Sequence, residues 1–140
     1  MRRGLSLLEL LLAIAVAGLL LGIGLPSLAA ISDGLAVRQE ARRIVAAHRR
    51  ARITAILRSR PVVLSVSADS LIVRAADDPD IDWKEAGPLS NGVVLAGGPR
   101  QITFSPVGIT VGVANASFTL TRGSAARTVI LSRLGRLRVE

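Results

Sequence analysis

The chain lacks cysteine altogether and has one histidine, and aromatic side chains make up only 2% of its 140 residues. The absence of cysteine excludes disulfide bonds and thiolate metal sites, although it does not identify a cellular compartment. The sequence also has no glycine-rich phosphate loop and no convergent pair of acids that would indicate a catalytic cleft. We therefore expect a protein that is not an enzyme and that has no metal site and no cofactor.

Acidic residues are scarce as well: 10 aspartates and glutamates stand against 18 lysines and arginines, which gives a formal net charge of +8. A basic balance favours polyanions or anionic lipids as partners. A solvated basic surface without a specific partner would give the same composition. Charge alone leaves both interpretations open.

Charge is missing entirely from residues 10–32, an apolar segment near the N-terminus. As an α-helix with a rise of 1.5 Å per residue, this segment spans roughly the 30 Å of a bilayer core. Arg2 and Arg3 precede it and nothing comparably basic follows directly, which predicts a cytoplasmic N-terminus. Everything after Ser32 is then expected on the other side of the membrane.

Three interpretations of this segment compete. A cleaved secretory signal would end near Ser27-Leu28-Ala29, but the apolar run is longer than the ~7–15 residues of an ordinary signal. A plain membrane anchor explains the length but neither Gly4 nor Glu9. Glu9 is unusual because a charge inside a membrane segment costs at least ~2.5 kcal/mol and usually marks function. The third interpretation accounts for both residues.

The motif Arg3-Gly4-Leu5-Ser6-Leu7-Leu8-Glu9-Leu10 resembles the class III leader of type IV pilins and type II secretion pseudopilins. The resemblance implies that residues 1–4 are a leader peptide, which a prepilin peptidase removes by cleavage between Gly4 and Leu5. It also implies that the new N-terminal amine of Leu5 is methylated. Residues 5–32 would then span the bacterial inner membrane and later lie in the core of a filament.

Glu9 is the candidate residue for subunit assembly. A carboxylate surrounded by lipid requires a cation, and the nearest candidate is the N-terminal ammonium of a neighbouring subunit. Charges about 4 Å apart attract strongly at low dielectric, so this pair would set the axial register of stacked subunits. Further along, Pro26 removes a helical N–H and predicts a kink, in keeping with the helix bending of pilins.

Residues 33–60 are expected to continue as an amphipathic helix, which ends before Pro61. The roughly 80 residues that follow can bury only ~60% of their unfolded surface alone, so we expect them to pack on this helix. His48 is expected to be packed rather than to bind a ligand, because no Cys, His or Glu partner is near it. The predicted packing face has i, i+3, i+4 spacing and comprises Val37, Ala41, Ile44, Val45, His48, Ala51 and Ala55, which Arg38, Arg42, Arg49 and Arg52 surround or oppose.

Residues 61–140 have the alternation of strands separated by glycine and proline turns. Pro61–Val66 and Ser70–Arg74 flank a short polar turn and predict a hairpin. The fold class is therefore α+β: a pilin-like long N-terminal helix, its first half embedded in the membrane, packed on a small, mostly antiparallel β domain. Further strands are expected at Gly92–Ala96, Gln101–Phe104, Ile109–Val113, Ala116–Thr121, Arg127–Ser132 and Arg136–Val139.

The second half of the chain resembles the GspH/FimT group of minor pseudopilins and minor pilins. The similar stretches are a helix-to-strand junction at Ala51–Arg58 leading into Pro61–Leu64, a turn at Ile102–Gly108 and a closing hairpin at Val129–Arg138. The hairpin includes a Gly-Arg-x-Arg element. The resemblance covers most of the chain but does not separate the two branches of the group.

An acidic stretch, Asp77–Glu85, interrupts this pattern, and we predict a solvated loop that packs Trp83 against the domain or a neighbouring subunit. Asp78, Asp80 and Asp82 have the 1-3-5 spacing of an EF-hand calcium loop. However, Trp83 stands where that loop requires glycine, and the bidentate glutamate is missing. No metal ligand is therefore assigned.

Four arginines near the C-terminus are the candidates for DNA binding: Arg136, Arg138, Arg133 and Arg127. On a strand, Arg136 and Arg138 point to one face while Leu137 and Val139 point to the core. Two exposed guanidiniums can hold adjacent phosphates, and in the FimT branch the matching element is linked to DNA binding during uptake. Arginines that protect an edge strand would look the same, and few aromatic rings are available to stack bases.

These features predict a minor pseudopilin, a structural component of the type II secretion pseudopilus involved in assembly or tip formation and in the export of folded proteins. The alternative is a FimT-like minor pilin of type IV pili that binds DNA for uptake through Gly135–Arg138. Either protein would have other pilins or pseudopilins, the prepilin peptidase and the inner membrane as partners. Its globular domain would be periplasmic or extracytoplasmic.

Overall fold

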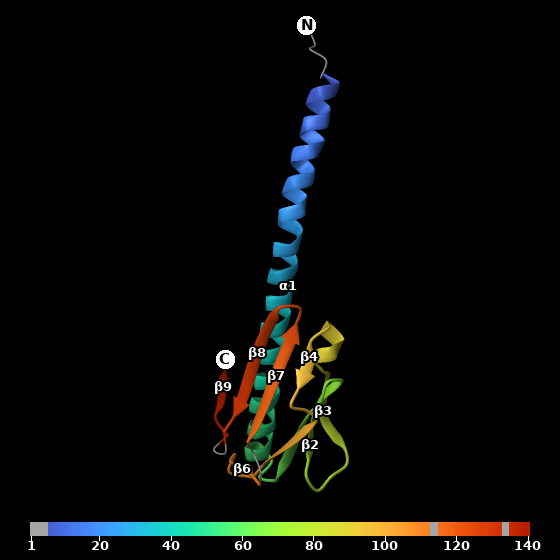
Figure 1. Cartoon of the computed structure of the whole chain (residues 1–140). Coiled ribbons are helices and arrows are strands. Elements are labelled where there is room, and N and C mark those ends of the chain that lie inside the picture. The colour runs from blue at the N-terminus through green and yellow to red at the C-terminus, as the bar shows by residue number, and fades with distance from the viewer. Residues whose placement is uncertain (1–5, 113–114, 133–134) are drawn as a thin grey trace. The chain divides into compact units, whose positions relative to one another are not determined.

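The computed structural model describes residues 6–112, 115–132 and 135–140, without the side chains of residues 23–26. Within these residues the chain forms a long helix, a short 3-10 helix and nine strands (Figure 1). It divides into two compact units, one ending at Ser32 and one starting at Asp33. The elements are α1 (Leu7–Leu57), β1 (Val62–Val66), β2 (Ser70–Ala75), β3 (Ile81–Ala86), η1 (Pro88–Asn91), β4 (Val94–Ala96), β5 (Arg100–Phe104), β6 (Thr110–Val111), β7 (Ala116–Arg122), β8 (Ala125–Leu131) and β9 (Leu137–Val139).

The first unit is the N-terminal part of α1, and its described side chains are exposed. Ser6 precedes the helix, and its hydroxyl oxygen accepts a hydrogen bond from the backbone N–H of Glu9 at 3.2 Å. Such a serine satisfies one of the free N–H groups at a helix start, and Ser6 followed by Glu9 has the spacing of a capping box. The sequence therefore fixes the helix start with the carboxylate in the first turn.

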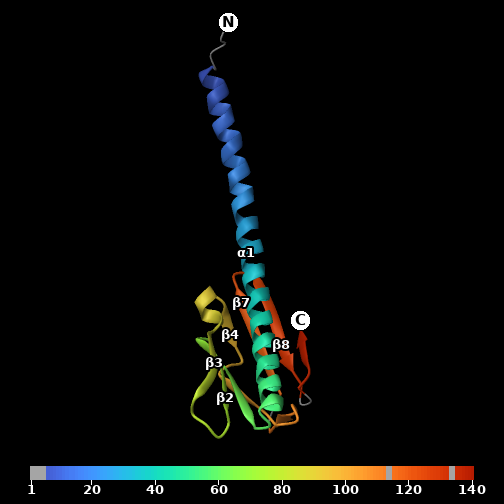
Figure 2. The same cartoon turned by 180° about the vertical axis from the view of Figure 1, so that it is seen from behind.

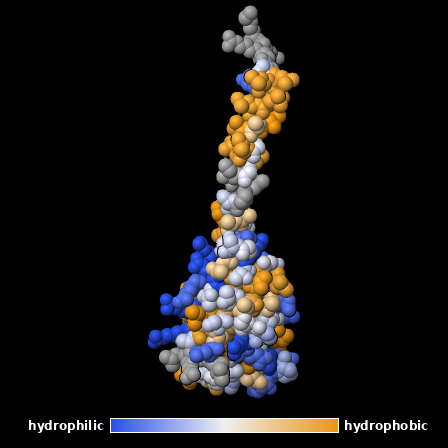
Figure 3. Space-filling view, in the orientation of Figure 1, coloured by the Kyte–Doolittle hydropathy of each residue, from blue (hydrophilic) through white to orange (hydrophobic). Residues whose placement is uncertain are grey.

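The apolar part of α1 is long and hydrophobic enough to cross a membrane, and no other helix in the described residues is. None of this apolar segment is buried, and Figure 3 shows hydrophobic residues on the face of it that is in view. Hydrophobic side chains on all sides of a helix suit lipid or a bundle of similar helices, not water. The helix is thus compatible with the expected membrane anchor.

The backbone of α1 runs as one helix from Leu7 to Leu57, a span that includes Pro26. A proline inside a helix removes one backbone hydrogen bond and destabilises the helix by about 3 kcal/mol or more. The side chain of Pro26 lies outside the described atoms, so a kink at this residue stays a prediction.

In the second unit, α1 buries the face that the spacing predicted. Val37, Ala41, Ile44, Ala51 and Ala55 are buried, and Val45 is half-buried. Ala47 and the carboxylate residue Glu40 are buried on the same side, although the apolar pattern did not include them. The prediction of a packing face from Asp33 onward is confirmed.

The strands form two antiparallel sheets. The first has the order β3-β2-β1-β5-β6 and the second the order β4-β7-β8-β9. Figures 1 and 2 show both sheets on the same side of α1, with the strands in front in the first view and the helix in front in the second. The core lies between the sheets and the helix, and its largest fully buried apolar side chains are Phe104, Phe118, Ile44, Leu64, Leu71, Leu120 and Leu131.

The predicted α+β fold is confirmed. Each expected strand occurs within two residues of its predicted bounds.

The loop prediction for Asp77–Glu85 is wrong from Ile81 onward. Residues 81–86 form β3, which pairs with β2 and places Trp83 opposite Val73. β3 is an edge strand with mostly exposed residues. Charged residues are common on such edges because they discourage further pairing, and here they conceal the strand pattern. Trp83 is half-buried against the core, as predicted.

Candidate functional site: an arginine-lined groove

The predicted cleavage site, Gly4 and Leu5, lies outside the described residues, so cleavage and methylation stay predictions. Glu9, the predicted assembly residue, is exposed in the first turn of α1. Within the described part of the chain its carboxylate makes no ion pair. Its role in subunit assembly stays a prediction.

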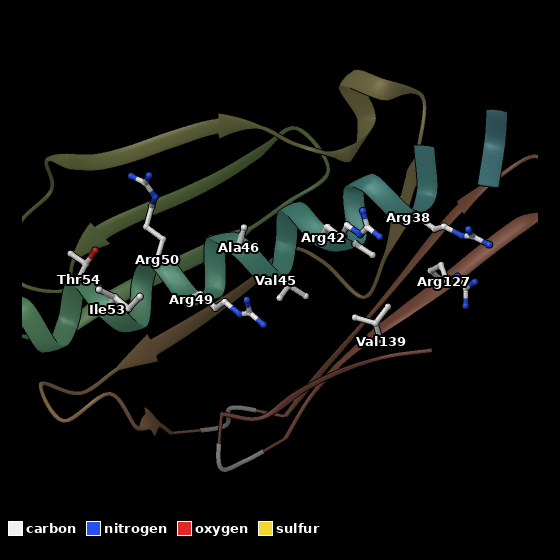
Figure 4. A pocket seen from close by; sticks show the side chains of 11 residues that line it. Arg38, Arg42, Val45, Ala46, Arg49, Arg50, Ile53, Thr54, Arg127 and Val139 are labelled. Carbon is white, nitrogen blue, oxygen red and sulfur yellow. The ribbon is translucent and has the colours of Figure 1, made fainter. Parts of the chain in front are cut away.

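A groove of about 1060 Å³ lies in the second unit between α1 and the hairpin of β8 and β9. Figure 4 shows the side chains of Val45 and Val139 pointing toward each other across it, while Arg50 points away. The groove therefore has an apolar centre with basic walls. Its apolar and small lining residues are Ala41, Val45, Ala46, Ile53, Thr54 and Val139, and its basic residues are Arg38, Arg42, Arg49, Arg50 and Arg127.

A second cavity, of about 470 Å³, shares Val45, Arg49 and Val139 with the groove. It adds the basic side chains of Arg52 and Arg136. The turn before β9 places Arg136 here: Gly135 has a φ of 74°, and the backbone N–H of Arg136 donates to the hydroxyl oxygen of Ser132 at 3.2 Å. Only glycine adopts such a positive φ without strain, so the Gly135-Arg136 sequence determines this position. The remaining lining residues are His48, Gly135 and Leu137.

Most of these arginines carry uncompensated charge. Six of them have no carboxylate within ion-pair distance among the described residues: Arg38, Arg42, Arg49, Arg52, Arg127 and Arg136. Arg50 is instead stacked on Trp83, with 5.1 Å from its guanidinium carbon to the ring centre. Clustered unpaired charges of one sign create a potential that attracts the opposite charge. We call these six residues, with the groove and the second cavity, the arginine surface.

His48 lies beneath this surface and is buried, as predicted. Burial and then the positive charges of Arg52 and Arg49 lower the pKa of His48 from 6.5 to about 4. Neither ring nitrogen has a hydrogen-bond partner among the described residues, and the ring contacts Phe104 edge-on at 4.9 Å between centroids. The imidazole is therefore neutral at physiological pH and packs as an apolar group.

The described residues contain no cluster of three or more His, Cys, Asp or Glu side chains that would hold a metal ion.

The four candidate DNA-binding arginines divide between different places. Arg127 lines the groove and Arg136 the second cavity, whereas Arg133 lies outside the described residues. Arg138 is exposed and pairs with Glu140 at 3.0 Å. Leu137 is half-buried against the core, as alternation predicted, whereas Val139 is 47% exposed, so the prediction that it points to the core is wrong. Arg136 precedes the strand and lines the same cavity as Leu137 and Val139, so the expected shared face of Arg136 and Arg138 is not formed.

The sequence pattern identifies the arginines of the helix but does not connect them with the C-terminal hairpin. Arg38, Arg42, Arg49 and Arg52 recur at spacings of four, seven and three residues, which is a signal for one side of a helix. Their proximity to Arg127 and Arg136 depends on β8 and β9 packing beside α1. No local pattern could have predicted that pairing.

The acidic turn between β2 and β3 contains Asp77, Asp78 and Asp80. The backbone N–H of Asp80 donates to Oδ1 of Asp78 at 2.9 Å, which orders the turn. Asp82 pairs with Arg58 instead of facing the other aspartates. The three residues with EF-hand spacing are therefore engaged in different contacts.

Comparisons with known proteins agree on one kind of protein. The profile of the family described as Type II transport protein GspH matches residues 40–135. The pilin-like protein PilA1 of Thermus thermophilus is 35% identical over 156 residues, covering 99% of each chain. The type IV minor pilin FimU of Pseudomonas aeruginosa matches in two crystal forms at 17% identity, with TM-scores of 0.61 and 0.57. The alignments cover 74% of this chain and 87% and 91% of the FimU chains, and at that identity they concern the fold.

Proposed function

This chain belongs to the GspH family of pilin-like proteins, and from that premise we propose that it is a minor pseudopilin of a type II secretion system. Minor pilins and pseudopilins are structural subunits of filaments, and the chain has their fold. In the proposed role the subunit resides in the inner membrane with its second unit on the periplasmic side. It is then lifted into a short pseudopilus that supports the export of folded proteins.

The observation that carries this proposal is the unburied apolar helix with a single carboxylate in its first turn. Hydrophobic side chains on every side allow the same helix to lie in lipid before assembly and among other helices afterwards. Glu9 then provides the one strong polar contact. We propose that it pairs with the amine of Leu5 on a neighbouring subunit, since leaving it unpaired in an apolar core would be costly.

Leader processing is tested by measuring the intact mass of the full chain after coexpression with a prepilin peptidase. The expected mass lacks Met1–Gly4 and carries one added methyl group. A Gly4→Asp variant is the control and should keep residues 1–4. A mature chain that starts at Ala30 would mean that the segment is a secretory signal and would overturn the proposal.

The secretion role is tested by deleting the gene and restoring it with the wild-type or the Glu9→Ala chain. Loss of exported folded proteins that only the wild-type chain restores supports the pseudopilin assignment. Surface piliation and DNA uptake are measured in the same strains. A deletion that leaves secretion intact and abolishes pilus functions assigns the subunit to a type IV pilus instead.

A second candidate function is DNA binding by a FimT-like minor pilin, and the unpaired arginines of the groove favour it. Arg127 and Arg136 project the uncompensated charge that phosphates require, and the arginines of α1 extend the surface. Arg138 contributes less than expected because it pairs with Glu140. The two aromatic types present, Phe and Trp, amount to 2% of the chain, so base stacking would be limited.

DNA binding is tested with the full chain in detergent by gel shift at several salt concentrations. A phosphate-binding surface should lose affinity steeply with salt, and Arg127→Glu and Arg136→Glu should each weaken binding. Arg100→Glu is the matched control, because Arg100 is exposed on β5 and lines neither cavity. Absence of a shift at low salt would eliminate this candidate.

A further inference from the structure

We propose that the arginine surface binds the acidic turn between β2 and β3 of a second copy of this chain, so that copies associate head to tail. The inference deepens the proposed role as a filament subunit and rests on it. It names which two surfaces of the subunit meet. The free charges of the second unit, their location and the chemistry of the groove all support it.

The free acids of the second unit are confined to few places. Among the described residues, the carboxylates of Asp33, Glu40, Asp82, Glu85 and Glu140 are each paired with an arginine. The acidic side chains left without an ion pair in that part of the chain are Asp69 and the cluster Asp77, Asp78 and Asp80. The described chain thus has one clustered negative surface, the acidic turn, which is complementary to the six unpaired arginines of the arginine surface.

These two surfaces adjoin edge strands of different sheets. The acidic turn precedes β3, an edge strand of the first sheet, and the groove adjoins β9, an edge strand of the second sheet. Figures 1 and 2 show β3 and β9 at opposite lateral edges of the second unit, and in Figure 3 hydrophilic residues project from the edge where β9 lies. The turn therefore cannot fill the groove of its own chain.

Complementary surfaces on opposite sides of one subunit favour a particular assembly. Such a contact is heterologous, and repeated copies form a ring or an open helical filament rather than a closed twofold dimer. A filament subunit requires this type of contact. Charge complementarity therefore selects a second copy as the occupant.

The chemistry of the groove fits an ordered acidic turn. Guanidinium groups bind carboxylates through two parallel hydrogen bonds, and the groove presents them on both walls. The hydrogen bond from Asp80 to Asp78 holds the turn in shape before binding, which reduces the entropy lost on association. The apolar centre formed by Val45 and Val139 can receive Pro79, which is exposed at the tip of the turn.

The absence of cysteine allows a direct test by disulfide crosslinking. One full-length chain carries Ala46→Cys in the groove, and a differently tagged chain carries Asp80→Cys in the turn. The two are mixed in detergent micelles and oxidised, and the mixed disulfide is quantified. Asp69→Cys replaces the turn cysteine in the control, because Asp69 is also exposed and unpaired among the described residues but lies in the turn between β1 and β2.

We expect the Ala46–Asp80 cysteine pair to give the mixed disulfide in clear excess over the control pair. Adding Arg42→Glu to the groove chain or Asp77→Arg to the turn chain should lower the yield about two- to fivefold, the range of one exposed ion pair. Combining both reversals should restore much of it. A yield of the mixed disulfide no higher than that of the control pair would overturn the inference. This holds even if the arginine surface of the same chain is found to bind DNA. If leader processing and filament entry persist without the crosslink, only this inference fails and the proposed function stands.

Discussion

Oε1 of Glu40, which is fully buried, lies 2.7 Å from a terminal nitrogen of Arg43, one turn further along α1. Arg43 also donates to Oε1 of Glu85 at 2.8 Å and to the carbonyl oxygen of Ala86 at 2.7 Å. Asn91 donates its amide N–H to the same oxygen of Glu40 at 2.5 Å. These contacts connect the helix with β3 and η1 through one buried carboxylate.

The first prediction concerns this network. Glu40→Ala should destabilise the chain by about 1–3 kcal/mol, because it leaves the amide of Asn91 without its acceptor and removes one partner of Arg43. Glu85→Ala should cost less, since the side chain of Glu85 is 41% exposed and water can replace it. Thermal unfolding of the full chain in detergent measures both. A larger loss for Glu85→Ala would mean that the buried carboxylate is not the centre of the network.

The second prediction concerns the pH dependence of stability. The folded chain lowers the pKa of His48 from 6.5 to about 4, so between these pH values the unfolded chain takes up a proton that the folded chain does not. Stability is therefore lost as the pH falls from about 6.5 to about 4, at a slope of at most about 1.4 kcal/mol per pH unit from this group. Below that window the contribution is constant.

His48→Gln is the variant that isolates this effect, because glutamine does not titrate. The wild-type chain should lose more stability than the variant between pH 7 and pH 4.5, measured by urea denaturation in detergent. The comparison cancels the titration of the carboxylates that both chains share. Equal losses in both chains would show that His48 is protonated in the folded state.

The third prediction compares two glycines that both have positive φ. A Cβ at Gly97 would overlap the carbonyl oxygen of Ser117, a backbone atom that cannot move aside easily, and φ is 89°. Gly112 has a φ of 78°, but no atom of the described residues lies within 4 Å of an added Cβ. Gly112→Ala should therefore cost only the conformational strain, about 1–2 kcal/mol, and Gly97→Ala distinctly more. Unfolding midpoints that are equal for the two variants would contradict this close approach.

The parts of the fold that local periodicity determines could be predicted from the sequence. The apolar N-terminal helix, the packing face around Ile44 and the hairpin of β1 and β2 each follow from side-chain spacing. β3 could not be predicted, because an edge strand has little need to alternate. The burial of the Glu40 carboxylate could not be predicted either. Arg43 is a near neighbour in the sequence, but Asn91, the other partner of Glu40, is 51 positions away.

In the candidate site, too, some features follow from the sequence and others only from tertiary packing. The C-terminal arginines could be selected by type, but their environment depends on tertiary packing. Only the packing of β9 beside α1 joins Arg136 to Arg49 and Arg52, and only the folded chain shows that Glu140 pairs with Arg138. The pattern of like charges selected the C-terminal arginines, whereas the arginine surface of the folded chain combines Arg127 and Arg136 with arginines of α1.

The last prediction follows from where the two complementary surfaces lie along α1. The ion pair between Arg58 and Asp82 places the acidic turn near the C-terminal end of the helix, whereas Ala46 lies in the groove. Arg58 directly follows the end of α1 and is twelve positions beyond Ala46, which corresponds to about 18 Å at the helical rise. A turn can therefore enter the groove of another copy only if the two copies are displaced axially by about that distance.

Two copies anchored in one membrane resist such a displacement, because an apolar segment that leaves the hydrocarbon core is penalised. The Ala46–Asp80 cysteine pair should accordingly crosslink weakly in resting membranes and strongly in detergent micelles or in assembled filaments. The yields are compared by immunoblot after identical oxidation, with the Ala46–Asp69 pair as the control for general collision. Equal crosslinking of the Ala46–Asp80 pair in resting membranes and in filaments would show that the contact does not depend on lifting one subunit past another.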